Sequence, residues 1–224
     1  MTFSIVARCA LTGMFGVAVS SSSPAVAARC AFARAGVGAA TSQNLTDPRL
    51  GEWALDALAS GDSPQEALDR LAATQPFMEH RQMLAVDAKG TPAAFTGARA
   101  LGLHASAKTR DAAAAGNLLA NEGVPAAMVE AFAGSRGHLG GRLLLAMRAG
   151  LEAGGEAGPV HSAGIKIVDA MPWALADLRV DWAEDGVLDR LEALWALYAP
   201  QAEAYVQRAL DPTAAPSFGV PGDL

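Results

Sequence analysis

The stretch that decides the fold is TFSIVAR, residues 2–8. Its residues alternate along a strand, so that the even-numbered ones, Thr2 among them, share one face. A TG turn at 12–13 and a second strand-like run at 15–20 come next. The amino-terminal segment is therefore predicted to form a β-hairpin.

Thr2 adds chemistry to this strand. Methionine aminopeptidases generally remove Met1 when the next residue is small, so the mature chain is expected to begin with threonine. A terminal threonine holds a hydroxyl nucleophile together with an α-amine of pKa ~7.7–8.0, which can serve as its general base near neutral pH. Most chains that begin with Met-Thr are simply trimmed, so the dipeptide alone does not define an enzyme.

The rest of the chain alternates between strands and helix pairs. Asp47 at an N-cap, followed by Pro48, and a capping box formed by Ser63 and Glu66 predict the starts of two helices. Residues 112–120 fit a strand, although their alanines would suit a helix equally well. The other expected strands span 30–35, 81–87, 92–96, 160–170 and 178–181, and the other expected helices span 124–133, 138–152 and 185–209.

This order of elements predicts an α+β fold. It suits two antiparallel sheets stacked face to face with helices on both outer faces, which is a four-layer αββα sandwich. We expect residues 1–210 to form it as a single domain, and residues 211–224, rich in Pro, Ala and Gly, to form a tail. The face of the last helix that carries Trp195 and Tyr198 would suit either core packing or a homodimer interface.

Composition excludes several classes of protein. The 224 residues suffice for one domain whose core is built mainly from Ala, Val and Leu, because 51% of the residues are hydrophobic and only 6% are aromatic. A net charge of −6 without a basic patch argues against nucleic acid and anionic membranes as partners. No apolar run reaches the roughly 18 residues that a membrane span needs.

Cysteine and histidine usage favours a reduced, cytoplasmic protein without metal or cofactor. Cys9 and Cys30 are too few for a disulfide framework, although one internal bridge stays open. The four histidines are scattered outside metal-binding spacings. Phosphate-binding loops, dinucleotide fingerprints and GxSxG elbows are also missing from the sequence.

The first 29 residues have a second interpretation. They are poor in charge, contain the apolar run 14–19 and offer AVA at 25–27 as a small-residue cleavage site, as a secretory signal peptide would. Against this interpretation, no Lys or Arg precedes Arg8, and the TG turn interrupts the apolar run. A secreted protein trimmed after Ala27 would lose Thr2 altogether.

The chain resembles DUF1028, a bacterial family of unknown function that is assigned to the N-terminal nucleophile (Ntn) hydrolases. The resemblance implies an αββα sandwich and an amidase-like centre. This chain departs from the family pattern at Cys9, where an acidic residue is usual, and also at Leu50 and Trp182. The matching stretches are TFSIVAR 2–8, GVAV 16–19, ARAGVGA 33–39, DPR 47–49 with Gly51, Gly116 and Asn117 with Leu119, and DLRVD 177–181.

The resemblance also implies roles for individual residues. Thr2 would attack an amide carbonyl while its α-amine moves the proton. Backbone N–H groups of the turn that holds Gly36 and Gly38, together with the side-chain amide of Asn117, would stabilise the oxyanion. The competing interpretation is ordinary turn geometry for the glycines and a satisfied buried amide for Asn117.

Ser20 and Arg34 are further candidates. Ser20, at the end of the second strand, would bond the terminal amine, or else it is a surface serine. Arg34 would anchor a substrate carboxylate, or form a salt bridge with Asp47 or Asp181. Arg179 and Asp181 are expected to form a buried pair that closes the sandwich.

Two functions from different classes compete. The first is a cytoplasmic, cofactor-free amidohydrolase that cleaves a small amide or peptide-like bond through an acyl-Thr2 intermediate. The second is a catalytically silent sandwich that serves as a binding or assembly module. The departure at Cys9 and the lack of a charged partner near Thr2 in the sequence favour the second.

Overall fold

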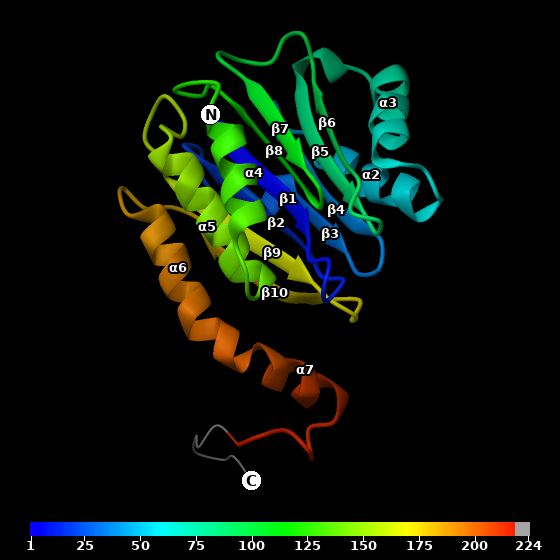
Figure 1. Cartoon of the computed structure of the whole chain (residues 1–224), viewed down its shortest axis with the longest axis vertical. Coiled ribbons are helices and arrows are strands. Elements are labelled where there is room, and N and C mark those ends of the chain that lie inside the picture. Colours follow the sequence, from blue (N-terminus) through cyan, green and yellow to red (C-terminus); the bar gives the residue numbers. More distant parts are fainter. Residues whose placement is uncertain (218–224) are drawn as a thin grey trace.

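Two antiparallel sheets packed face to face form the centre of the molecule (Figure 1), as a computed structural model that describes residues 1–217 shows. One sheet has six strands and the other has four. In spatial order, the six strands are β10 (Ala174–Val180), β9 (Ser162–Val168), β2 (Phe15–Ser21), β1 (Thr2–Arg8), β8 (Ala112–Asn117) and β7 (Ala105–Thr109). The four are β3 (Ala31–Arg34), β4 (Gly38–Asn44), β5 (Arg81–Asp87) and β6 (Pro92–Thr96).

Helices cover the outer face of each sheet, which completes the predicted αββα sandwich. The six-stranded sheet carries α4 (Val124–Gly134), α5 (Leu139–Glu152) and α6 (Val187–Tyr198), and the four-stranded sheet carries α2 (Arg49–Ala59) and α3 (Pro64–Thr74). The remaining helices are short: α1 (Ala27–Cys30), η1 (Met78–His80), η2 (Ala199–Gln201) and α7 (Ala202–Leu210). In Figure 1, α6 and α7 extend beyond the edge of the sandwich.

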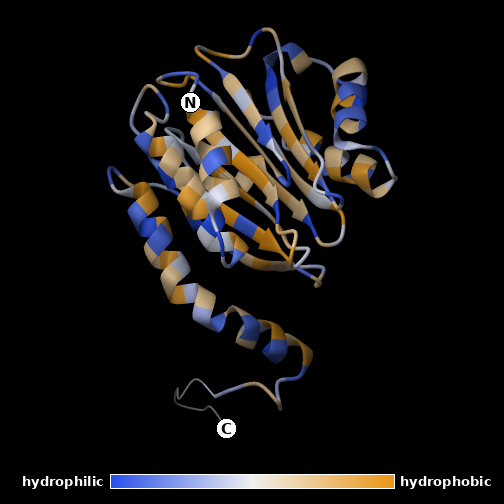
Figure 2. Cartoon of the chain, viewed as in Figure 1, coloured by the Kyte–Doolittle hydropathy of each residue, from blue (hydrophilic) through white to orange (hydrophobic). Residues whose placement is uncertain are grey.

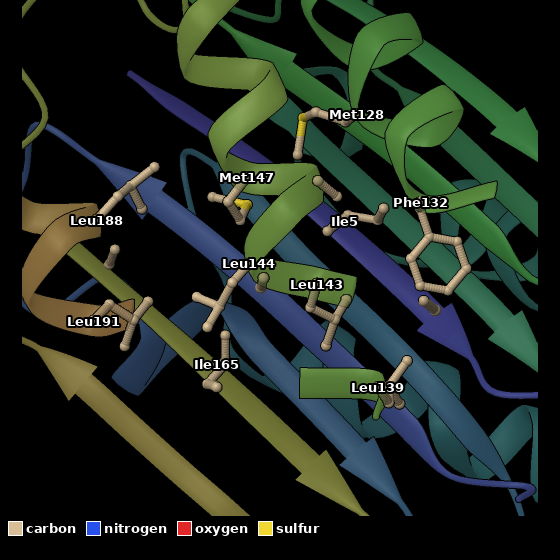
Figure 3. Close-up of a cluster of buried hydrophobic side chains, with 14 of the residues drawn as sticks. Ile5, Met128, Phe132, Leu139, Leu143, Leu144, Met147, Ile165, Leu188 and Leu191 are labelled. Carbon is tan, nitrogen blue, oxygen red and sulfur yellow. The ribbon is translucent and has the colours of Figure 1, made fainter. Parts of the chain in front are cut away.

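Strand β1 lies in the interior of the six-stranded sheet, between β2 and β8. Its odd-numbered residues, Phe3 and Ile5 among them, join the core under the helices, where Figure 3 shows Ile5 among the side chains of Phe132 and Leu143. Its even-numbered residues face the other sheet, as the contacts of Val6 show. The alternation predicted from the sequence is therefore confirmed, and both faces of β1 are covered.

Small apolar residues fill much of the space between the sheets. Ala113 and Ala115 of β8 pack there with Val17 and Val19 of β2 and with Ala39 of β4. Small side chains let the two sheets approach to the usual spacing of about 10 Å. Figure 2 shows the strands mainly in the hydrophobic colours, so this composition explains why a chain with few aromatics still has a continuous core.

Several expectations from the sequence need correction. Residues 38–44 are not among the expected strands, but they form β4, so the turn that holds Gly36 joins two strands. Residues 105–109 form the unexpected edge strand β7, whose half-exposed residues lack a strong apolar signal. Residues 112–117 are a strand, and the long helix expected over 185–209 is interrupted at η2, where Pro200 has no N–H to donate.

Other sequence predictions are confirmed. The capping box is present, since the Ser63 hydroxyl accepts from the Glu66 N–H and the Glu66 side chain accepts in return. The helices expected at 124–133 and 138–152 match α4 and α5 closely. The expected tail is described only as far as residue 217, and residues 218–224 lie outside the described part of the chain.

The first 27 residues are part of the sandwich. They supply β1 and β2, two inner strands of the six-stranded sheet, so removal after Ala27 would take away the middle of that sheet. Cys9 and Cys30 are buried free thiols, which leaves the bridge between them unformed. No helix within residues 1–217 is long and apolar enough to cross a membrane.

Two predictions concern contacts of residues near the carboxyl end of the chain. Arg179 and Asp181 do form an ion pair at 3.6 Å, but their side chains are 40% and 53% exposed, so this is not the buried pair that was expected to close the sandwich. Trp195 packs against His138 and Gly140, and the Tyr198 hydroxyl donates to a backbone carbonyl. These contacts account for the apolar face of α6 by core packing, and the homodimer stays a prediction.

Candidate active site

Thr2 begins β1 at one end of the space between the sheets, where it is only 6% exposed. Ser21 of β2 and Asn117 of β8 lie directly opposite it in the two neighbouring strands. Directly opposed residues in antiparallel strands point to the same face, with Cβ atoms about 4.5–5.5 Å apart. The structure therefore brings Thr2 and the predicted Asn117 together and adds Ser21 to them.

A chain of hydroxyl groups leads from Thr2 to a cation. Arg29 donates to the Ser23 hydroxyl at 2.6 Å, and the hydroxyls of Ser23 and Ser21 are 2.8 Å apart. Ser21 donates its single proton to the Met1 carbonyl oxygen at 2.5 Å, so the Ser23 hydroxyl is the donor to Ser21. The Thr2 hydroxyl donates to the same oxygen at 2.6 Å. Two hydroxyl donors thus converge on one carbonyl oxygen.

A second network fixes the amide of Asn117. Ser4 donates to Gln43, and Gln43 donates to the Gln82 oxygen at 2.8 Å. Gln82 in turn donates to the Gly116 carbonyl at 3.0 Å, and this contact fixes its orientation because a carbonyl can only accept. The Asn117 amide nitrogen must therefore donate to the Gln82 oxygen, at 3.2 Å, which leaves its second N–H for another acceptor.

Glu156 brings a buried carboxyl group to the same end of the sandwich. It follows α5, forms an isolated bridge with Leu119 and is only 5% exposed. One carboxyl oxygen accepts from the Ser22 N–H at 3.2 Å, whereas the other has no hydrogen-bond partner among residues 1–217. Burial raises the pKa of Glu156 to about 7, although the nearby amino group of Met1 and His161 oppose this shift.

Ser20 lies on the other face of β2 from Thr2. It is paired with Phe3, which belongs to the core under the helices, and its buried hydroxyl has no partner within the described residues. A displacement by one residue along a strand reverses the face. Ser21 therefore stands where Ser20 was expected, beside the amino end of Thr2.

Three of the predicted site residues lie away from Thr2, namely Gly36, Gly38 and Arg34. Gly38 is five residues from Gln43 along β4, which is about 16 Å at the usual rise of a strand. Gly36 has a φ of +71° in the turn before β4, and a Cβ on Gly38 would lie 2.3 Å from the Val86 carbonyl oxygen, so both glycines have structural reasons. Arg34 pairs with Glu52 at 3.0 Å and with Asp56 at 2.8 Å, rather than with either predicted aspartate.

Two clefts differ in position and size. A cleft of about 610 Å³ lies at the Arg34 end of the sandwich, where Lys166 and Trp173 also line it. A smaller one, of about 350 Å³, is lined by Glu156 and Gly158 at the Thr2 end. The larger cleft is remote from the buried polar groups, so we place the candidate site by its chemistry rather than by volume. Within residues 1–217, no group of three or more His, Cys, Asp and Glu side chains could hold a metal ion.

Sequence reasoning missed several residues of this site, although some left a signal. Residues 20–23 are four consecutive serines at the end of a strand paired with β1, which indicates a polar strand end. Glu156 is a lone acid in the segment GGEAG, 154–158, whose glycines indicate a loop but not its position. Gln43 and Gln82 have no local signal, because only the pairing of β4 with β5 places them side by side.

The protein is an α+β sandwich. Its first strand begins with a buried threonine that lies among hydroxyl, amide and carboxyl groups. The chain belongs to DUF1028, a family of unknown function, whose model matches residues 2–190. No curated protein matches the chain.

One solved structure is similar to this chain over most of its length. The crystal structure of a DUF1028 protein from Silicibacter pomeroyi is 30% identical, with a TM-score of 0.82, over 88% of this chain and 89% of that chain. Anbu (ancestral beta-subunit) from Yersinia bercovieri matches at 10% identity over 98% of each chain, with a TM-score of 0.39. Anbu from Hyphomicrobium sp. strain MC1 matches at 8% identity over 92% of this chain and 98% of that chain, with a TM-score of 0.36.

Proposed function

We propose that this protein is an amidohydrolase of the N-terminal nucleophile class, in which removal of Met1 makes Thr2 the terminal residue. The observation that carries the proposal is the convergence of the Thr2 and Ser21 hydroxyls on one carbonyl oxygen, at 2.6 and 2.5 Å. A hydroxyl nucleophile and a hydrogen-bond donor around the same acyl oxygen are the parts that acyl transfer needs. The substrate is a small amide or peptide-like compound, the enzyme works without a cofactor, and it acts in the cytoplasm.

The groups around Thr2 supply each step. The free α-amine of Thr2 takes the hydroxyl proton as Oγ1 attacks the amide carbon, and it then passes the proton to the leaving nitrogen. The Ser21 hydroxyl and the spare N–H of Asn117 donate to the oxyanion. Each such donor is worth roughly 2.7–4 kcal/mol of transition-state stabilisation. In this proposal they take the role that the turn at Gly36 and Gly38 was expected to have.

The first test is the chemical state of the amino terminus. Intact-mass measurement and amino-terminal sequencing of protein from its native host should show a chain that begins at Thr2. A chain that keeps Met1 has no free threonine amine, and this result would overturn the proposal.

Replacement of the nucleophile is the second test. Thr2→Ala should lower amide turnover by at least about 1000-fold and abolish labelling by an electrophilic β-lactone, because no hydroxyl remains to be acylated. Thr2→Ser is the matched control, since it keeps the hydroxyl and should retain labelling. Unchanged turnover in Thr2→Ala, with the terminus verified, would show that Thr2 is not the nucleophile.

A binding module is the second candidate function. The observation in its favour is that Thr2 is only 6% exposed, while the cleft of about 610 Å³ lies at the other end with Arg34, Lys166 and Trp173 on its walls. In that case neither Thr2 variant would alter ligand binding, whereas Trp173→Ala would abolish ligand binding in the cleft.

A further inference from the structure

Met1 occupies the position that the acyl part of a substrate would take. Its carbonyl oxygen accepts from both Thr2 Oγ1 and Ser21 Oγ, which are the proposed nucleophile and a proposed oxyanion donor. In the structure, Met1 is the acyl group on the nitrogen of Thr2. A substrate acyl group would be bound to Oγ1 of the same residue, only a few atoms away. The surroundings of Met1 therefore describe the pocket for the acyl group.

The side chain of Met1 lies against a glycine. A Cβ on Gly158 would be 2.6 Å from Met1 Cε, a distance that a real Cβ essentially never shows, and 3.2 Å from Met1 Sδ, which is a tight contact. Gly158 also lines the cleft of about 350 Å³ at this end of the sandwich. The space beside Gly158 thus accommodates a long, unbranched apolar side chain.

The charge of the Met1 α-amine acts on Glu156, because it opposes the rise in the pKa of that carboxyl group, but the two groups form no direct hydrogen bond. This carboxylate is connected to the site through Ser22, whose N–H donates to one oxygen at 3.2 Å, while Ser21 next to it bonds the Met1 carbonyl. The other carboxyl oxygen is buried and has no partner within residues 1–217. A buried acceptor without a donor is unfavourable, and an ammonium group is a donor that would satisfy it.

We propose, on the basis of the function proposed above, that the substrates are amides of α-amino acids with a free α-amine and an unbranched apolar side chain. Glu156 binds the substrate ammonium group, Gly158 makes room for the side chain, and Ser21 and Asn117 hold the carbonyl oxygen. Once Met1 has left, the substrate residue takes its place. The activity is then that of an aminopeptidase or aminoacyl amidase.

The covalent chemistry balances without a further reactant. Thr2 Oγ1 forms a bond to the acyl carbon, the C–N bond breaks, and the hydroxyl proton reaches the leaving amine through the Thr2 α-amine. Water then adds to the aminoacyl ester, gives one proton back to Oγ1 through the same amine, and releases the amino acid.

An alternative role for Glu156 predicts a different result. If this carboxylate only held the α-amine of Thr2, it would be a positioning residue, and its loss would slow all substrates equally. If it binds the substrate ammonium, its loss affects only substrates that have one. Matched substrates with free and acetylated amines separate these two roles.

The experiment uses the full chain with Met1 removed, as verified by mass, and two probes, L-methionine p-nitroanilide and its N-acetyl form. The wild type should cleave the free-amine probe with a kcat/KM about tenfold to 100-fold above that of the acetylated probe. Glu156→Gln should bring the two values close together by slowing only the free-amine probe. Glu152→Gln, an exposed acid at the end of α5, is the matched control and should leave the ratio unchanged.

Gly158→Ala tests the side-chain pocket. Its added Cβ should lower the kcat/KM for the methionine probe about tenfold relative to the alanine p-nitroanilide. The atoms nearest to the added Cβ belong to the far end of the flexible Met1 side chain, so Gly158→Ala should fold. Circular dichroism checks the folding of Gly158→Ala and of Glu156→Gln.

The outcomes separate the inference from the function on which it rests. The inference would be overturned if both probes were cleaved at similar rates that Thr2→Ala abolishes and Glu156→Gln leaves unchanged. The hydrolase proposal would survive this result. Equal slowing of both probes by Glu156→Gln would also overturn the inference. Failure to cleave the methionine probe overturns it as well, and labelling by a β-lactone that depends on Thr2 then decides whether the hydrolase proposal survives.

Discussion

The two ends of the space between the sheets differ in polarity. At the Thr2 end, the side chains of Ser4, Gln43, Gln82 and Asn117 are buried to 99% or more and bonded to one another. At the far end, the same space is filled by apolar residues, with Phe15 among them. Burying polar groups is unfavourable unless every partner is supplied, whereas apolar filling is favourable without such conditions. The buried polar network at the Thr2 end therefore serves more than packing, and variants at each end test this contrast.

The largest effect on stability is expected at the apolar end. Phe15 is 2% exposed and packs between the sheets, so Phe15→Ala should lower the free energy of unfolding by about 3–5 kcal/mol. Chemical denaturation measures the loss. The variant should keep the reactivity of Thr2 at temperatures where it stays folded, and a selective loss of that reactivity would contradict the division between the two ends.

Glu156 should make stability depend on pH. Its pKa is raised from 4.5 to about 7 in the fold, mainly by burial, so the native state binds the proton more tightly than the unfolded chain. Stability should therefore be highest below pH 4.5 for this group and decrease as the pH rises to 7, by up to about 3 kcal/mol. The amino group of Met1 and His161 oppose the rise in this pKa, and the value of about 7 already includes their effect.

Glu156→Gln checks this prediction because glutamine stays neutral. The variant should be more stable than the wild type at pH 8 and equal to it near pH 4, as measured by denaturation at both pH values. A variant that is less stable at pH 8 would show that the carboxylate is held by a donor and is not penalised by burial.

The amide network is expected to contribute less than the apolar packing. Gln82→Ala leaves Gln43 and Asn117 without their common acceptor and should lower the free energy of unfolding by about 1–3 kcal/mol. It should also slow turnover, because Asn117 loses its orientation.

Gln65→Ala, on the exposed surface of α3, is the control and should change stability by less than about 0.5 kcal/mol. A double-mutant cycle with Asn117→Ala measures their coupling, and additive effects would contradict a shared network.

The sequence predicted the layers of this fold better than its exact strands. Alternation in residues 2–8 and the capping box at Ser63 depend on near neighbours, and both are confirmed. Strands β4 and β7 were missed because their small and polar residues acquire strand structure from pairing with β5 and β8. Tertiary contacts of this kind leave no local pattern to find.

The candidate site shows the same limit at the scale of single residues. Thr2 and Asn117 were both named from the sequence, and the register places them opposite each other. Ser20 was named in place of Ser21 because a strand's face reverses with every residue, and the register could not be known to within one position. Glu156 is 154 positions from Thr2 in the chain, so only the fold could bring the two to one end.

The smallest effect is expected at Arg34, which sharpens the contrast between the ends. Its guanidinium pairs with Glu52 and Asp56, but all three side chains are more than a third exposed, and exposed pairs contribute only about 0–1 kcal/mol. Arg34→Gln should therefore change the free energy of unfolding by less than about 1 kcal/mol and leave amide turnover unchanged, as denaturation and kinetics would measure. Because Arg34 lines the cleft of about 610 Å³, a loss of turnover on its replacement would move the functional site to that end of the molecule.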